Sequence, residues 1–210
     1  MNERPDRRRV RTRQSLISAA QSLLSQGRTS VSIQEITEQA QVGFGSFYNH
    51  FESKEQLFQA AVEETIASWL LVRDEAVEDI TDPAEVVSTS FHVAGRFQRA
   101  HPRLTRILLS SSSALLGDDK GFRQRGIKNI NQGIATHRFD PISPEISFTI
   151  AATALLGLMH HLDLHPEAEV SSISAQFAER VLIMLGLTHT QAGSVAYTPE
   201  SSTTRADPES

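Results

Sequence analysis

Residues 32–54, SIQEITEQAQVGFGSFYNHFESK, decide the fold of this chain. Ser32 stands three residues before Glu35, which is the spacing of a capping box at the start of a helix. A short turn at residues 41–43 separates that helix from a second one, which we expect over residues 44–50. Two short helices joined by such a turn predict a helix-turn-helix, in which the second helix enters the DNA major groove.

Apolar residues at helical spacing extend this pattern on both sides. A helix that starts near residue 12 and stops at Gly27 carries one apolar face, formed by Leu16, Ile17, Ala20, Leu23 and Leu24. The buried side of the next helix is expected to carry Ile33, Ile36 and Ala40. Ser53 and Gln56 form a second capping box, which starts a long helix to about Glu78. We therefore expect a three-helix DNA-binding domain over residues 12–52, preceded by a basic arm over residues 1–11 that is disordered when alone.

The charge is unevenly distributed along the chain. The net charge of −5 argues against binding to nucleic acid only when the whole chain is described by that one value. Residues 1–54 hold eight basic and five acidic side chains, a charge of +3, which leaves −8 for the remainder. A basic end on an acidic body suits a DNA-binding protein whose other part must stay off DNA.

The remaining chain continues as helices with clear start and stop signals. We expect helices over residues 83–99, 102–116, 119–136, 144–162 and 170–185, with caps at Asp82 and at Asp118 or Asp119, and a stop at Gly186. No convincing alternating strand is present in the sequence. The pattern predicts an all-α fold of about nine helices, with a second helical domain over residues 53–187 and a disordered tail over residues 188–210.

The composition narrows the class of protein. The chain has no cysteine, so disulfides, thiolate metal sites and cysteine nucleophiles are excluded, and a reducing cytoplasm is favoured. The basic N-terminus lacks the apolar segment of a secretory signal. The longest apolar run, residues 150–159, is too short to cross a bilayer, so we expect a soluble cytoplasmic protein with no membrane partner.

The side chains of the second short helix favour contact with DNA. Phe47 and Phe51, four residues apart, can pack inward and leave Phe44 and its neighbours with an outward component. Phe44 can contact thymine methyl groups, and Ser46 can donate or accept a hydrogen bond. Asn49 can pair with adenine, and Gln34 on the preceding helix can reach a base edge. Tyr48 and His50 suit phosphate oxygens, and Lys54 lies in the first turn of the next helix, where free amides favour an anion. The alternative is an aromatic cluster that closes a small three-helix core, with Lys54 merely solvated.

The segment from Arg13 to Leu70 resembles the N-terminal domain of the tetracycline-repressor (TetR) family of bacterial transcription regulators. The residues that carry the resemblance are Ile17-Ser18-Ala19-Ala20, Gly27, Val31-Ser32-Ile33-Gln34-Glu35-Ile36, Ala40-Gln41-Val42, Gly45-Ser46-Phe47-Tyr48-Asn49-His50-Phe51 and Ser53-Lys54-Glu55-Gln56-Leu57. The resemblance covers about a quarter of the chain. It implies that Tyr48, His50 and Lys54 bind phosphates, and that Phe44, Gly45, Ser46 and Gln34 face bases.

The predicted DNA-binding set joins these residues to the arginines and the helix starts. It comprises Arg9, Arg11, Arg13, Ser32, Gln34, Gly43, Phe44, Gly45, Ser46, Tyr48, Asn49, His50 and Lys54. Two positions depart from the family pattern. Gln41 stands where glycine is usual in the turn, so a left-handed backbone there carries strain. Gly43 stands where a Ser or Thr cap is usual, although glycine caps at little loss.

The family resemblance also implies a homodimer in which the last two helices of each subunit form a four-helix interface. Residues 144–162 support this, because their apolar side chains wrap more than one face of the helix. The predicted interface comprises Phe148, Ala151, Leu155, Leu158, Ile173, Phe177, Val181 and Met184. The alternative is the core helix of a monomer. A twofold dimer would bind a palindromic operator in double-stranded DNA.

The resemblance further implies a small-molecule effector site among the helices after the DNA-binding domain. Candidate lining residues are Trp69, Arg73, Phe91, His92, Arg96, Phe97 and Phe122, although most would be ordinary core or surface residues in any helical bundle. An effector that prefers the state unable to bind DNA releases the operator.

Other signals are weaker. A cluster near a helix end comprises His160, His161, Asp163 and His165. It has two interpretations: a pair of metal ligands, or imidazoles placed favourably at the C-terminus of a helix. Ser110–Ser113 lacks the elbow of a serine nucleophile, and no nucleotide loop is present. We expect no enzyme, metal or cofactor, and predict a ligand-responsive repressor. The alternatives are a metal-binding or catalytic helical bundle, and an architectural DNA-binding protein without a ligand.

Overall fold

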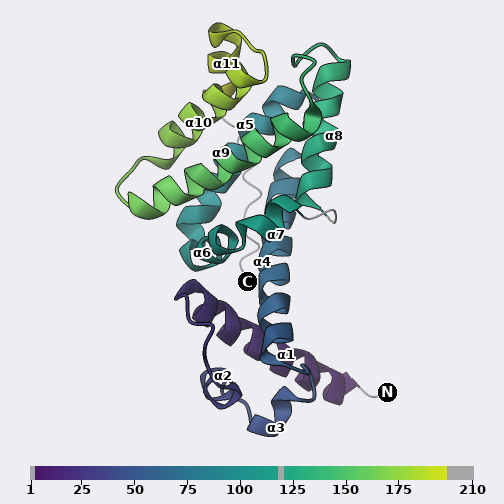
Figure 1. The fold of residues 1–210 in the computed structure, drawn as a ribbon, viewed down its shortest axis with the longest axis vertical. Helices are drawn as coiled ribbons and strands as arrows, with labels where there is room; N and C mark the ends of the chain where they lie inside the picture. Colours follow the sequence, from purple (N-terminus) through teal and green to yellow (C-terminus); the bar gives the residue numbers. More distant parts are fainter. Residues whose placement is uncertain (1–2, 118–120, 198–210) are drawn as a thin grey trace, which may run out of the picture. The chain divides into compact units, whose positions relative to one another are not determined.

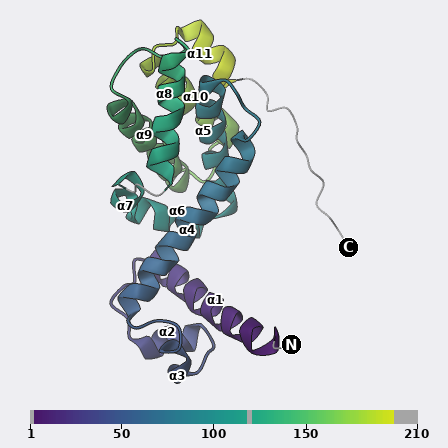
Figure 2. The ribbon, with the colours of Figure 1, turned by 90° about the vertical axis from the view of Figure 1, so that its right-hand side faces the viewer.

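The computed structural model describes residues 3–117 and 121–197, and within them it contains eleven α-helices and no strand (Figures 1 and 2). The first seven are α1 (Glu3–Ser25), α2 (Ile33–Gln39), α3 (Phe44–Phe47), α4 (Lys54–Val77), α5 (Pro83–Ala100), α6 (Pro102–Ser110) and α7 (Ser112–Gly117). The others are α8 (Phe122–Ala135), α9 (Pro144–Leu164), α10 (Val170–Met184) and α11 (His189–Ala196). The all-α prediction is confirmed, with more helices than the expected nine.

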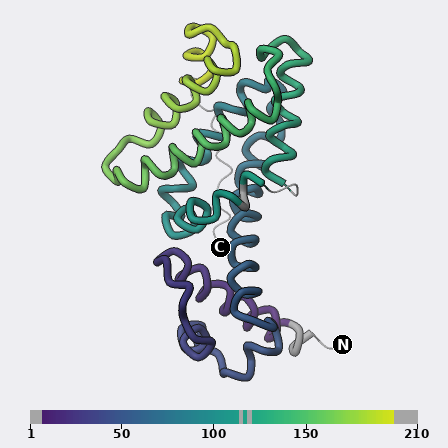
Figure 3. Tube along the Cα trace, viewed as in Figure 1, coloured from purple at the N-terminus to yellow at the C-terminus, as the bar shows by residue number. Residues whose placement is uncertain are grey.

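The chain forms two compact units, and each is described by itself. The first comprises Met1–Val72 and Phe97–Asp118, and the second Arg73–Arg96 and Asp119–Ser210. The long helices α4 and α5 each contribute residues to both units, as the continuous tube in Figure 3 makes visible. The expected boundary after residue 52 therefore differs from this division, because α6 and α7 group with the N-terminal helices.

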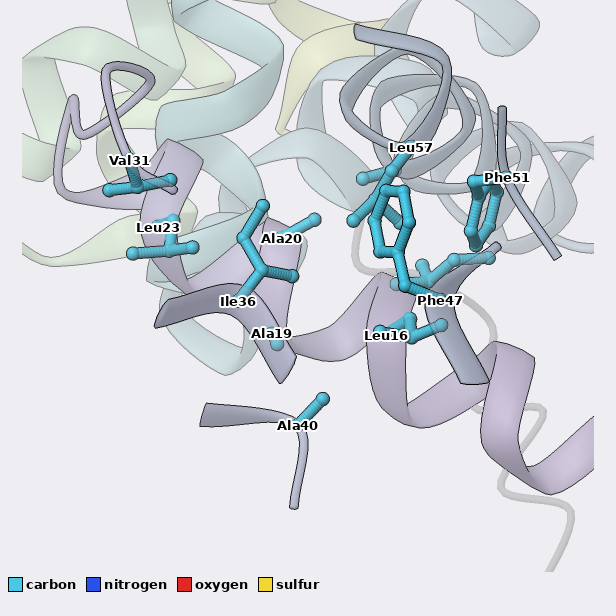
Figure 4. Packing of buried hydrophobic residues seen from close by; sticks show 12 residues of the cluster. Leu16, Ala19, Ala20, Leu23, Val31, Ile36, Ala40, Phe47, Phe51 and Leu57 are labelled. Atoms are coloured by element: carbon cyan, nitrogen blue, oxygen red, sulfur yellow. The ribbon is translucent and has the colours of Figure 1, made fainter. Parts of the chain in front are cut away.

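The first unit is built around an apolar cluster under the helix-turn-helix. Leu16, Ile36, Phe47 and Leu57 come from α1, α2, α3 and α4, and none of them has measurable exposure. Figure 4 shows these side chains in one cluster. Burying each side chain of this size contributes roughly 1.5–3 kcal/mol. This core holds the four-residue helix α3, which is too short to be stable alone.

Four helix ends use the same backbone motif. In each, the last turn is closed by one residue in the left-handed region: Gly27 (φ 69°), Gln41 (φ 55°), His137 (φ 55°) and Gly186 (φ 108°). After α2, for example, the amide of Gln41 donates to Glu38 at 3.1 Å and that of Val42 to Thr37 at 3.0 Å. This is the Schellman arrangement, which favours glycine. Gly27 and Gly186 stop helices as expected, and Gln41 has the predicted left-handed backbone.

The basic arm is helical where the structure describes it, which corrects the expectation of disorder. Helix α1 begins at Glu3 and includes the arginines at positions 7, 8, 9 and 11. Pro5 lies in the first turn, where a missing amide costs no helical hydrogen bond. The residues that follow it include many good helix formers, so α1 extends without interruption into the apolar stretch that anchors it.

The tail predicted from residue 188 also needs correction. Thr188 and Gln191 form a complete capping box that starts α11, and Ala192 and Ala196 are buried. The side chain of Ser88 on α5 donates to the carbonyl of Val195 at 3.2 Å. The signal was the Thr–x–x–Gln spacing, which the Ser/Thr-rich composition obscured. The rest of the predicted tail, residues 198–210, lies outside the described residues.

The single helix expected over residues 102–116 is interrupted at Ser111 (φ −109°, ψ 23°), between α6 and α7. Ser110 bonds its hydroxyl to the carbonyl of Ile107 at 3.0 Å, and a serine run offers such alternatives to helical hydrogen bonds. The predicted caps Asp118 and Asp119 lie outside the described residues.

In the second unit, α9 packs along α8 and α10 (Figure 1). Phe148 of α9 fits against Gly126 of α8, where an added Cβ would lie 2.4 Å from its ring. With its 21 residues, α9 is long and apolar enough to cross a membrane by length and composition alone, contrary to the expectation from the shorter run. Within the structure, 44% of that stretch is buried.

Candidate nucleic-acid interface

The short helix α3 divides its aromatic residues between the core and the surface. Phe47 and Phe51 are buried, whereas Phe44 and Tyr48 are 53% and 57% exposed. The exposed rings meet edge to face, with centroids 5.9 Å apart. Packing therefore accounts for Phe47 and Phe51, as the alternative of a closed aromatic core requires, but it does not account for Phe44 and Tyr48. Their side chains remain available for contact with DNA.

Two arginines of α1 lie near the residues that follow α3. The guanidinium carbon of Arg13 lies 5.4 Å from the centre of the Phe51 ring, an arrangement that favours a cation over the ring face. Partial burial, together with the charges of Arg9 and Arg13, lowers the pKa of His50 below 6.5. The helical arm thus brings two cations to the same side of the unit as His50, which is where a phosphate would be favoured.

Lys54 begins α4 and is half-buried rather than fully solvated. Its ammonium donates to the carbonyl of Val31 at 3.3 Å, which links the start of α4 to the loop before α2. Nearby, the Ser53 hydroxyl accepts from the amide of Gln56 at 3.2 Å. The side-chain oxygen of Gln56 accepts from the backbone amide of Glu52 at 2.7 Å, and not from that of Ser53. The second half of the predicted capping box is therefore displaced by one residue.

At the start of α2, Ser32 caps the helix by accepting from the amide of Glu35 at 3.1 Å. Only this half of the predicted box is formed, because Glu35 pairs with Arg28 instead. Gln34 is exposed and donates to Glu38. Sequence reasoning missed both side-chain pairs, although the four-residue spacing of Gln34 and Glu38 was a usable signal.

The remaining residues of the predicted DNA-binding set lie on α1, in the turn before α3, on α3 and just after it. Arg9, Arg11, Gly43, Gly45 and Asn49 are exposed, and Ser46 is half-buried. Gly43 caps α3 without a side-chain bond and has an ordinary extended backbone, and an added Cβ would meet Ser46 at a comfortable 3.7 Å. The departure at Gly43 therefore leaves the turn unstrained, unlike that at Gln41.

This arrangement, with a buried-core helix-turn-helix and exposed aromatic and basic side chains, is that of a DNA-binding transcriptional regulator. Residues 16–61 match the family model of bacterial regulatory proteins of the tetR family, and residues 82–198 match that of the tetracyclin repressor-like C-terminal domain. The second match covers more than half of the chain. The chain belongs to the TetR family.

Several solved structures are similar to this chain in fold. RolR in complex with resorcinol shares 26% identity and a TM-score of 0.62, covering 92% of this chain and 97% of that one. RolR without ligand shares 28% identity and a TM-score of 0.67, covering 89% and 97%. FadR from Bacillus subtilis in complex with stearoyl-CoA is similar in fold, with a TM-score of 0.67, 12% identity, and 80% and 97% covered.

The predicted effector-site residues fall in different units. Trp69 and Phe97 lie in the first unit, both buried, with ring centroids 5.4 Å apart. The indole N–H of Trp69 has no hydrogen-bond partner in the described part of the chain. Arg73, Phe91, His92, Arg96 and Phe122 belong to the second unit.

Within the second unit, most of these side chains have structural partners. Arg73 donates to Ser90 at 3.2 Å and to Asp74 at 2.9 Å. His92 bonds the carbonyl of Ala196 at 3.0 Å, and Phe122 packs edge-on to Phe148. Phe91 is buried and Arg96 is exposed. The structure thus supports the simpler interpretation for His92 and Phe122, which stabilise the fold.

The residues of the predicted dimer interface differ in how much surface they expose in the single chain, and the interface itself stays a prediction. Leu158 is fully buried in the single chain, and Phe148, Leu155 and Val181 are nearly so, which leaves them little surface to offer a partner. Ala151, Ile173, Phe177 and Met184 are half-buried. The exposed apolar side chains of α9 are instead Ile146, Ile150 and Leu164, which the sequence alone did not separate from the core positions.

Two histidines near the end of α9 lie beside each other. His161 and His165 stack with ring centroids 4.5 Å apart, and His165 lies 3.6 Å from Glu167. Among the described residues, no group of three or more His, Asp or Glu side chains is arranged to hold a metal ion.

Proposed function

We propose that the protein is a cytoplasmic repressor that binds a palindromic operator as a homodimer and releases it when a small molecule binds. The observation that carries this proposal is the pair of exposed rings, Phe44 and Tyr48, in a segment whose His50 lies near Arg9 and Arg13 of α1. Apolar rings on the surface of a helix-turn-helix offer contact to thymine methyl groups, while the arginines neutralise phosphates.

The homodimer is supported by the exposed side of α9. Ile146 and Ile150 are 57% and 46% exposed, one helical turn apart, on a helix whose other sides are packed. Ala154 and Gly157 continue along the helix with small side chains that permit close approach. A second copy that covers this surface would remove the apolar side chains from water. The α3 helices of the two copies would then be related by a twofold axis.

The effector is proposed to be a small aromatic compound with a hydroxyl group. RolR, the most similar in sequence of the structures described above, was crystallised with resorcinol. In this chain the buried indole of Trp69 lies against Phe97 and retains an unused N–H donor. A phenolic oxygen can accept from that donor, and an unused buried donor is otherwise costly.

Selection from random double-stranded DNA tests the operator proposal. The full-length protein is expected to enrich one palindromic sequence with half-sites about one helical turn apart, or a multiple of it. Enrichment of no sequence would contradict operator binding and favour an architectural protein. Enrichment of a single asymmetric site would contradict the dimer.

Resorcinol is the first effector to test, because the chain has one tryptophan. Binding near Trp69 is expected to change its fluorescence and to lower operator affinity over the same concentration range. Trp69→Phe, which keeps a ring and removes the donor, provides the control and should weaken operator release. Unchanged fluorescence and affinity at saturating resorcinol would contradict this choice of effector, while leaving DNA binding intact.

A further inference from the structure

Gln34 and Glu38 lie one turn apart on α2, and both side chains are exposed. Nε2 of Gln34 donates a hydrogen bond of 3.0 Å to Oε1 of Glu38. The backbone of Gln34 is held as well, because its carbonyl accepts from the Thr37 hydroxyl at 2.9 Å. The pair is therefore fixed on the surface of the helix-turn-helix before any DNA is bound.

The chemistry of the pair determines which way the Gln34 amide points. A carboxylate offers only acceptors, so only the NH₂ side of the amide can face Glu38. The two ends of a glutamine amide are otherwise interchangeable by rotation. With the NH₂ side held, Oε1 of Gln34 points away from Glu38 and remains an acceptor for another molecule.

The other acidic residue of α2 does not compete for this role. Glu35 pairs with Arg28, on the loop before the helix. Within residues 3–117 and 121–197, no cation forms an ion pair with Glu38, and Gln34 is its hydrogen-bond partner. An acidic side chain next to a DNA-binding surface repels phosphate, so Glu38 opposes non-specific binding while it orients Gln34.

We propose that Glu38 is a positioning residue that presents Gln34 to DNA as a hydrogen-bond acceptor. The base opposite Gln34 must then carry an exocyclic amino group. In the major groove, adenine offers N6–H₂ and cytosine offers N4–H₂, whereas guanine and thymine present only acceptors at the equivalent place. The operator half-site therefore has adenine or cytosine, and not guanine or thymine, at the position that Gln34 contacts.

This inference rests on the proposed operator binding and on contact between Gln34 and a base. It adds a base preference at the one operator position that Gln34 contacts. It assigns that preference to Glu38, which does not touch the DNA. Both side chains are exposed, so substitution is expected to leave the fold intact, and thermal unfolding of each variant verifies this.

Two variants of Glu38 test the need for an acceptor-only partner. E38Q and E38A remove the same negative charge, so they raise affinity for all DNA sequences equally. E38Q keeps an oxygen that accepts from the Gln34 amide, but it adds an NH₂ group that can donate to Oε1 of Gln34, so it permits both orientations of that amide, as E38A does. Random-sequence selection is carried out with the full-length wild type, E38Q, E38A and Q34A.

In the wild type, one position of each half-site should prefer adenine or cytosine by about fivefold or more over guanine and thymine. E38Q, E38A and Q34A should each reduce that ratio below about twofold without changing the other positions, because only a carboxylate excludes the Oε1 side of the Gln34 amide.

Three results would overturn the inference while leaving operator binding established. E38A could keep the wild-type preference, which would show that Gln34 needs no positioning. E38Q could keep the full wild-type ratio, which would show that Gln34 needs no acceptor-only partner. Q34A could keep the preference while E38A loses it, which would make Glu38 itself the contact. A wild-type selection that enriches no sequence would instead overturn the proposed function.

Discussion

The rings of Phe44 and Tyr48 meet edge to face on α3, at an interplanar angle of 70°, although each ring is more than half exposed. Tyr48 also packs edge-on against the buried Phe47, with centroids 5.4 Å apart. The buried ring thus supports one exposed ring, which in turn supports the other. The two side chains that we propose to face DNA are thus supported by the core before DNA is bound, which would reduce the entropy lost on binding.

Phe44→Ala is expected to change operator preference more than it changes the salt dependence of binding. The ring contacts bases and not phosphates in this account, so the salt slope should stay constant. Because Phe44 is half exposed, the variant should lose less than about 1 kcal/mol of unfolding free energy.

Phe47→Ala provides the contrast for that experiment. Its ring is fully buried, so the variant should lose about 3–5 kcal/mol and bind no DNA because the first unit unfolds. Urea unfolding and fluorescence anisotropy measure both quantities. A uniform loss of affinity over all DNA sequences in the Phe44 variant would assign that ring to the core as well.

His50 predicts opposite effects of pH on stability and on DNA binding. Its pKa is lowered in the folded protein, by partial burial and then by Arg9 and Arg13, so the unfolded state binds more protons and stability falls as pH falls below 6.5. A phosphate beside the ring favours the charged form and raises the pKa again. Operator affinity should therefore increase as pH falls below 6.5, although the free protein becomes less stable.

Binding titrations between pH 5.5 and 8 check this, with His50→Gln as the control that removes the titrating group. The increase in affinity should be absent in His50→Gln. An increase of equal size in both proteins would show that another group is responsible.

Gln41→Gly is expected to stabilise the protein by about 1 kcal/mol. Gln41 has a φ of 55°, which is costly for a side chain with a Cβ and free for glycine. Gln39→Gly, at the last residue of α2, should instead destabilise the protein because glycine is a poor helix former. Urea unfolding of the two variants should give shifts of opposite sign, and shifts of the same sign would contradict strain at Gln41.

Ile150→Glu is expected to convert the homodimer to a folded monomer. Ile150 is exposed in the single chain, so a charge there costs the monomer little, while two glutamates near a twofold axis would repel each other. Sedimentation analysis and circular dichroism measure mass and folding separately. A variant that remains dimeric would show that the partner covers another surface.

The sequence allowed the helix-turn-helix to be located almost to the residue, because caps, turn and apolar spacing all act locally there. Helix α2 starts after Ser32 and α3 starts at Phe44, as the pattern indicated, although α3 ends at Phe47 and not at residue 50. Burial in the second unit was harder to predict. In α9, both Ile150 and Leu158 are aliphatic and at helical spacing, yet one is exposed and the other fully buried. That difference depends on how neighbouring helices pack, which residues distant in sequence determine.

Side-chain pairs between elements were beyond prediction for the same reason. The contact of Arg13 with Phe51 joins α1 to the loop after α3, and Lys54 bonds a carbonyl 23 residues away. The helical arm was missed because composition alone favoured disorder, although the chain there continues directly into a helix with a buried face.

The measurement that tests the central claim most directly is the salt dependence of binding to the selected operator, compared with a scrambled sequence. The wild type should prefer the operator by 10³-fold or more at physiological salt, with an affinity that falls steeply as salt rises. Tyr48→Ala combined with Lys54→Ala should remove most of that affinity, while thermal unfolding shows a folded protein. Equal affinity for the operator and the scrambled sequence, or a double variant that binds as the wild type does, would contradict the account.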